Sequence, residues 1–126
     1  MIKFMKDVEC MEMIRRNLYL NRIRPFIDQD LIKVLIGLRR SGKTILLSQI
    51  RDILLERGVP EENIIEINFE SRRFKKLEDA DTFYQYVTNR VEKANGKVYL
   101  FLDEIQHVTE WHSVIPSFRI DFDCDI

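Results

Sequence analysis

The spacing of hydrophobic and polar positions changes several times along the chain, and each change marks a predicted element. Apolar residues at helical spacing predict a first helix over about Val8–Leu20. Leu31–Ile36 is a short, mostly apolar run, which is typical of a buried strand. From Lys43 the spacing is helical again, and Gly58 with Pro60 ends that helix. The first half therefore predicts helix, strand and helix.

The second half begins with a strand and a helix. Ile64–Phe69 alternates apolar and polar residues, as a half-buried strand does. After a charged connection, an apolar stripe at helical spacing predicts a helix that either Asp79 or Asp81 caps and that ends near Gly96. The stripe consists of Ala80, Phe83, Val87 and Val91.

Two more strands follow with a short helix between them. Val98–Leu102 is an apolar strand, and the segment after it predicts a short helix broken by Pro116. Cys124–Ile126 is typical of the first residues of another strand. Strands and helices that alternate at this spacing predict an α/β fold, a parallel sheet wrapped by helices.

Composition narrows the choice of partner. The chain has 126 residues, 20 Lys plus Arg against 21 Asp plus Glu, and an ordinary globular share of hydrophobic residues. With charges this evenly balanced, the chain as a whole has no net electrostatic attraction to nucleic acid or membranes. The basic run at Arg72, Arg73, Lys75 and Lys76 is interpreted as solvated surface, so nucleic acid is not indicated as a partner.

Cysteines and histidines add little chemistry. Cys10 and Cys124 match no metal-ligand spacing, and the apolar runs are too short to span a membrane. We therefore expect reduced thiols and a cytoplasmic location. His107 and His112 have no partner at ligand spacing and are expected on the surface.

The strongest motif lies between the first strand and the following helix. Residues 37–44 match G-x-x-x-x-G-K-[ST] at every fixed position, where glycines let backbone N–H groups approach a phosphate closely. The start of the helix adds unpaired N–H donors and the positive end of its dipole. Lys43 is expected to reach the β- and γ-phosphates of ATP, and the Thr44 hydroxyl to bind Mg²⁺. The predicted nucleotide-binding residues are Gly37, Leu38, Arg39, Arg40, Ser41, Gly42, Lys43, Thr44 and Ile45.

Two carboxylates follow the apolar strand Val98–Leu102. Asp103 is predicted to serve Mg²⁺, mainly through a water, and Glu104 to act as the general base on the attacking water. The alternative is that both acids simply mark the exposed end of a strand. A carboxylate that activates water favours hydrolysis over phosphotransfer, although a phosphotransferase stays a third and weaker hypothesis.

These residues resemble a known family. The phosphate loop, the Leu102-Asp103-Glu104-Ile105-Gln106 segment and Trp111 are similar to prokaryotic AAA-type P-loop ATPases that carry a C-terminal domain of unknown function. The resemblance implies an ATP-hydrolysing core with sheet order 5-1-4-3-2. It also implies that Gln106 and Trp111 lie in a structured element beside the nucleotide, whereas burial statistics alone favour a core position for Trp111.

The resemblance also implies a missing part. Members of that family continue past this point through a strand that ends in a polar sensor residue, whereas residues 31–126 correspond to a partial ATPase domain behind an N-terminal helical segment, residues 1–30. The strand that begins at Cys124 should lie between Leu31–Ile36 and Val98–Leu102. We therefore expect an incomplete sheet, which a homodimer or higher oligomer could complete by segment exchange.

Two functional hypotheses follow. The first is ATP binding, with Mg²⁺-dependent hydrolysis in the intact protein. The second is a non-catalytic module that binds ATP or ADP without turning it over.

Overall fold

The computed structural model describes residues 20–28, 32–34 and 40–126. Residues 20–23 are helical and lead into a short 3-10 helix; the rest of the helix predicted over Val8–Leu20 lies outside the described residues. The elements are η1 (Arg24–Phe26), α2 (Arg40–Glu56), η2 (Glu61–Asn63), β1 (Ile64–Asn68), η3 (Arg72–Glu78), α3 (Ala80–Lys93), β2 (Val98–Asp103), η4 (Ile105–His107), α4 (Trp111–Asp121) and β3 (Cys124–Asp125). Within the described ranges, no helix is long and apolar enough to cross a membrane.

The strands form a parallel sheet of order β1-β2-β3, which confirms the predicted α/β class. β1 pairs with β2 along its whole length, from Ile64 opposite Tyr99 to Asn68 opposite Asp103. β3 pairs only with the first two residues of β2. Each crossover between neighbouring parallel strands contains a helix, as parallel pairing requires.

Residues 32–34 continue this order beyond β3. The backbone N–H of Lys33 donates to the carbonyl oxygen of Ile126 at 2.9 Å. β3 therefore lies between β2 and the segment before the phosphate loop, as the implied sheet order requires. Residues 32–34 are nevertheless not strand in the structure, so the prediction of a regular strand is wrong there. The neighbouring β3 is two residues long and offers too short a ladder to define one.

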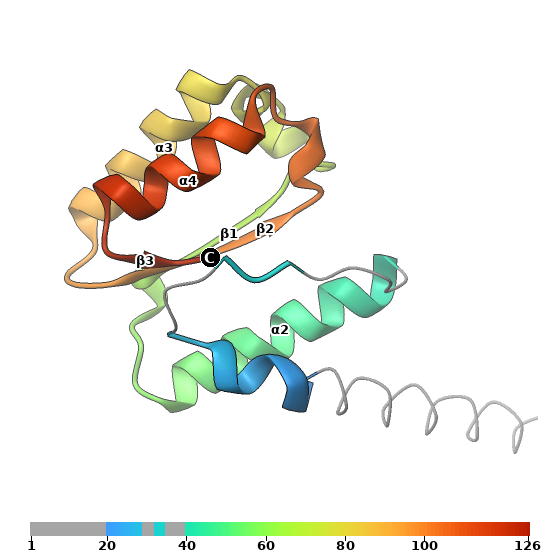
Figure 1. The fold of residues 1–126 in the computed structure, drawn as a ribbon, viewed down its shortest axis with the longest axis vertical. Helices are drawn as coiled ribbons and strands as arrows, with labels where there is room; N and C mark the ends of the chain where they lie inside the picture. The colour runs from blue at the N-terminus through green and yellow to red at the C-terminus, as the bar shows by residue number, and fades with distance from the viewer. Residues whose placement is uncertain (1–19, 29–31, 35–39) are drawn as a thin grey trace, which may run out of the picture.

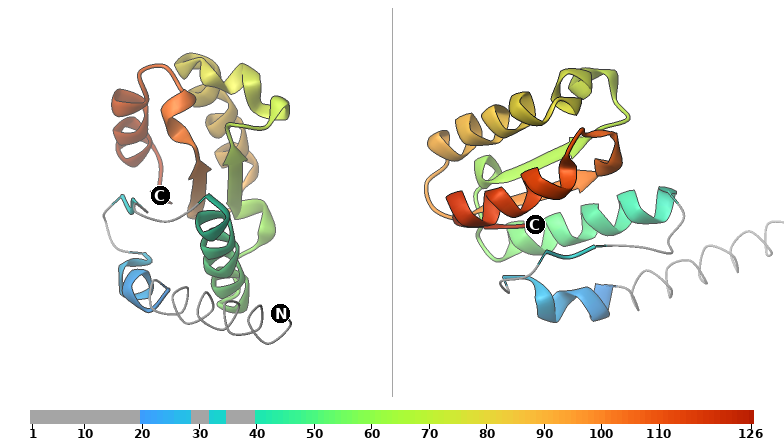
Figure 2. Two further views of the ribbon diagram at one scale, coloured as in Figure 1. Left: turned by 90° about the vertical axis from the view of Figure 1, so that its right-hand side faces the viewer. Right: turned by 45° about the horizontal axis from the view of Figure 1, so that its top comes forward.

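The sheet separates two layers of helices (Figures 1 and 2). Alternate residues of β2 face opposite sides, because strand side chains have a period of two. Val98 and Leu100 pack in the core with α3 and α4, whereas Tyr99 and Phe101 pack with α2 and residues 20–28. β2 is therefore covered on both faces, which explains its continuous apolar sequence.

Phe83 of α3 is at the centre of the larger core. Its side chain is fully buried, and its ring lies edge-on to Phe69 at 5.1 Å and to Phe118 at 5.2 Å between ring centroids. Such edge-to-face pairs add to the free energy of burial. These contacts attach α3 and α4 to the end of β1.

Three helix predictions can be compared with the structure. α2 begins at Arg40 rather than at Lys43, so the end of the phosphate loop forms its first turn. Asp79 caps α3 by accepting a hydrogen bond from the Thr82 N–H at 3.0 Å, which decides between the two candidate caps. The prediction that Pro116 breaks the last helix is wrong, because α4 continues through it. One face of α4 is buried, and its packing outweighs the lost N–H.

Candidate functional site

The described part of the phosphate loop is the first turn of α2. Gly42, Lys43, Thr44 and Ile45 lie in this turn, with Lys43 half-buried and Thr44 exposed. Gly37, Leu38 and Arg39 lie outside the described residues. Arg40 and Ser41 are described only as helical backbone. The helix start leaves its first backbone N–H groups without partners in the helix, which suits an anion.

The first turn of α2 approaches the end of β2. The Thr44 hydroxyl donates to a carboxylate oxygen of Asp103 at 3.3 Å, although 59 positions separate the two residues in sequence. Asp103 is the last residue of β2. The fold therefore brings together the two residues that were predicted, from separate motifs, to serve Mg²⁺. Both supply oxygen atoms, the ligands that this ion prefers.

Glu104 follows at a sharp turn of the backbone. Its φ of 60° lies in the left-handed region, which residues other than glycine rarely adopt. The turn ends β2 and begins η4. Gln106, the second residue of η4, donates a side-chain hydrogen bond to the Glu104 carboxylate. Gln106 thus orients Glu104. The sequence indicated only that the two residues are close neighbours in the chain.

A cavity of about 360 Å³ opens beside these residues. Its lining includes Lys43 of α2, Asp103, Glu104 and Gln106 after β2, and Trp111 at the start of α4. The remaining lining is mostly aliphatic, from α2, β2 and residues 32–34. Lys43 and both acids therefore share one opening, and their positions agree with the predicted grouping.

Trp111 lies between the core and the cavity. Its side chain is partly buried against the core around α3 and α4, and it also lines the cavity. Its ring lies 3.5 Å from that of His112, between ring centroids. Trp111 therefore connects the core to the candidate site.

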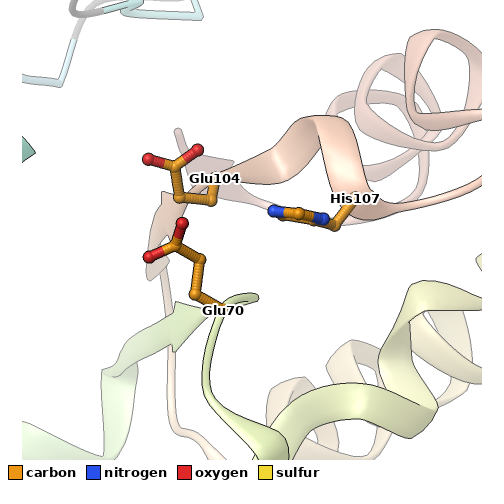
Figure 3. A group of neighbouring side chains, drawn as sticks. All are labelled: Glu70, Glu104 and His107. Carbon is orange, nitrogen blue, oxygen red and sulfur yellow. The ribbon is translucent and has the colours of Figure 1, made fainter.

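Two further side chains at this end of the sheet were missed. Glu70 follows β1, and its carboxylate lies with that of Glu104 and the imidazole of His107 in one group whose ligand atoms are all within 4.8 Å of one another (Figure 3). His107 is exposed, as expected, but two carboxylates lie near its ring. Nothing in the sequence spacing shows this group, because the pairing of β1 with β2 brings Glu70 to Glu104.

A polar network holds residues 20–28 and 32–34 at the opposite, amino end of the strands. The Tyr99 hydroxyl donates to Asp28 at 2.6 Å, and the Lys97 ammonium lies 3.0 Å from the same carboxylate. Burial alone would raise the pKa of Asp28, but these two contacts hold that pKa below its usual value. Burial and the Asp28 contact together raise the pKa of Tyr99.

Asp125 of β3 completes this network. It is buried, accepts a hydrogen bond from the Asp28 backbone N–H at 2.8 Å, and pairs with the Lys33 ammonium. A buried carboxylate is stable only when paired in this way. Asp125 therefore joins β3 to the segments on both sides of residues 29–31.

Comparison with known proteins gives a family and a distant relative. The family described as "AAA domain" matches residues 29–126. An uncharacterized protein of Haemophilus influenzae is 41% identical over 114 residues, which cover 90% of this chain and 28% of the relative. The chain thus spans under a third of that relative's length. No solved structure matches the chain.

Proposed function

Because the chain belongs to the AAA domain family, we propose that it binds ATP at the first turn of α2 and hydrolyses it with Mg²⁺. Family membership supports nucleotide binding in general. The single observation that carries the more specific proposal is the 3.3 Å contact between Thr44 and Asp103. The contact joins the end of the phosphate motif to the acid that follows a core strand.

The start of α2 would hold the phosphates. Its free N–H groups and dipole attract negative charge, and Lys43 adds a positive charge at the mouth of the cavity. A Cβ built on Gly42 meets none of the described residues within 4 Å, so their packing leaves this side of the helix open. Phosphate oxygens can approach the backbone closely there.

Thr44 and Asp103 are the residues that would hold Mg²⁺. Their oxygen atoms are close enough to share one ion, directly or through a bound water. The ion supplies charge neutralisation on the β- and γ-phosphates. Lys43, from the same turn, adds a second positive charge to that neutralisation.

Glu104 would accept the proton of the attacking water. It directly follows Asp103, and the left-handed turn with the Gln106 hydrogen bond fixes its direction. A general base has to lie within hydrogen-bond reach of the water, directly or through one other water. With Asp103 at the ion, the adjacent Glu104 would lie beside the phosphates.

The test combines binding and turnover in the full chain. Mg-ATP at about 100 times its Kd should stabilise the protein by about 2.7 kcal/mol in a thermal melt, and phosphate release should follow. Lys43→Ala should lose both signals, whereas Glu104→Gln should keep the thermal shift and lose phosphate release. Lys75→Ala, which changes an exposed lysine of η3, is the matched control and should keep both.

The outcomes separate the two hypotheses. No thermal shift with Mg-ATP in the unmodified chain would refute the proposal. A shift without phosphate release would favour the non-catalytic module.

A further inference from the structure

Glu70, Glu104 and His107 form a group that the ATPase proposal uses only in part. They come from three places in the chain: the turn after β1, the turn after β2 and the last residue of η4. Their ligand atoms all lie within 4.8 Å of one another. Figure 3 shows the Glu70 side chain and the His107 ring directed toward the Glu104 side chain.

Backbone hydrogen bonds hold the three positions together. The Phe69 N–H donates to the Asp103 carbonyl oxygen at 3.0 Å, which continues the β1–β2 ladder and sets Glu70 beside Glu104. The His107 N–H donates to the Glu104 carbonyl oxygen at 3.2 Å and closes the turn of η4. The group thus depends on rigid strand ends as well as on its exposed side chains.

The donor set selects a class of ion. Two carboxylates and an imidazole suit zinc, manganese and similar divalent transition metals, whereas Mg²⁺ prefers oxygen ligands alone. Ligands at about 2.1 Å from one ion can be at most about 4.2 Å apart. The ligand atoms of the group lie within 4.8 Å of one another, and Glu70 and His107 are exposed, so their side chains are free to adjust to an ion. A cation here would also relieve the repulsion between the two carboxylates.

We propose that Glu70, Glu104 and His107 bind one divalent transition-metal ion, with Zn²⁺ as the ion to test. This site differs from the predicted Mg²⁺ site, whose oxygen ligands are Thr44 and Asp103. Metal binding itself does not depend on the proposed ATPase activity. Its consequence does rest on that activity: an ion bound to Glu104 occupies the carboxylate that would accept the proton, so it inhibits hydrolysis.

The binding test uses the full chain without nucleotide, titrated with Zn²⁺ in excess Mg²⁺ and followed by calorimetry. We expect one ion per chain. His107→Ala and Glu70→Gln should each weaken binding by at least about 10–100-fold, the loss that changes even in outer-shell residues cause. His112→Ala is the matched control, since this neighbouring histidine lies against Trp111 and should bind Zn²⁺ as the unmodified chain does.

Three binding results would overturn the proposal. They are the absence of Zn²⁺ binding, equal affinity in His107→Ala, and complete displacement of Zn²⁺ by Mg²⁺, which would identify an ordinary oxygen-ligand site. Far-UV circular dichroism of each variant shows whether a loss of binding reflects unfolding. The conservative Glu70→Gln change keeps the side chain's size, so it tests the charge at that position even if His107→Ala is unstable.

Inhibition is measured separately by phosphate release at rising Zn²⁺. Half-inhibition should need at least about tenfold more Zn²⁺ in His107→Ala than in the unmodified chain. Equal inhibition of both would refute the regulatory part and leave the binding result intact. If the unmodified chain releases no phosphate, the ATPase proposal fails, whereas the calorimetric result still decides whether the metal site exists.

Discussion

Replacing Gly42 with alanine should show whether glycine is required at this position for stability or for nucleotide binding. Gly42 is the third residue of α2, and its φ is not among the positive values of the described residues. A Cβ added there meets none of the described residues within 4 Å. Neither the backbone conformation nor packing against the described residues therefore requires glycine at this position. We infer that the requirement comes from a phosphate that approaches the backbone.

The substitution should raise the stability of the nucleotide-free protein and lower its affinity for Mg-ATP. Glycine within a helix costs roughly 0.5–1 kcal/mol relative to alanine, so Gly42→Ala should stabilise the nucleotide-free protein by up to that amount. In a domain of this size, such a change raises Tm by about 2–5 °C. The added methyl group would occupy the space that phosphate oxygens need. We expect Mg-ATP affinity to fall at least about tenfold, which corresponds to about 1.4 kcal/mol.

Gly58→Ala is the matched control. Gly58 follows α2 with a φ of +91°, a conformation that costs an alanine about 1–2 kcal/mol. This variant should therefore have a lower Tm and an unchanged affinity for Mg-ATP. Thermal melts with and without Mg-ATP measure both quantities in both variants. The reasoning fails if Gly42→Ala binds Mg-ATP like the unmodified chain, or if it loses as much stability as Gly58→Ala.

Three further predictions concern the amino end of the sheet and the cavity. The pKa of Asp28 is lowered in the folded state, so the stabilisation that ionised Asp28 provides is present above the unfolded value of about 3.8 and is lost as the pH falls below that value. Asp28→Asn should therefore flatten the acid limb of a plot of Tm against pH, and an unchanged limb would contradict this. Asp125→Asn removes the buried carboxylate charge that pairs with the Lys33 ammonium, and urea unfolding should show a loss of about 3–5 kcal/mol, whereas a loss below about 1 kcal/mol would mean that water reaches the pair. Trp111 is the one tryptophan of the chain and lines the cavity, so Mg-ATP should change its fluorescence, and an unchanged spectrum under saturating nucleotide would place the ligand elsewhere.

Local patterns predicted the local elements well. The alternation in Ile64–Phe69 and the apolar run Val98–Leu102 gave β1 and β2 within one residue at their ends. Asp79 was one of two candidate caps, and the hydrogen bond to Thr82 identifies it. In each case the determining interactions lie within a few residues of one another, so spacing and residue type contain the information.

Contacts between distant segments were harder to predict. His107 appeared isolated because ligand spacing was sought within the sequence, whereas the β1–β2 register brings Glu70 to it from another turn. Pro116 was expected to end a helix on propensity alone, but the buried face of α4 outweighs that cost. In both cases tertiary packing changes what a local signal means.

The geometry of the candidate site depends on helix packing more than on strand pairing. β3 links β2 to residues 32–34 only at the amino ends of the strands, far from Asp103. What brings Thr44 to Asp103 is the packing of α2 on the sheet, where Leu46 and Leu54 are buried in one core with Phe101. Large-to-small changes in this core leave cavities and shift their neighbours. The Thr44–Asp103 distance is therefore set by the face of α2 that packs on the sheet.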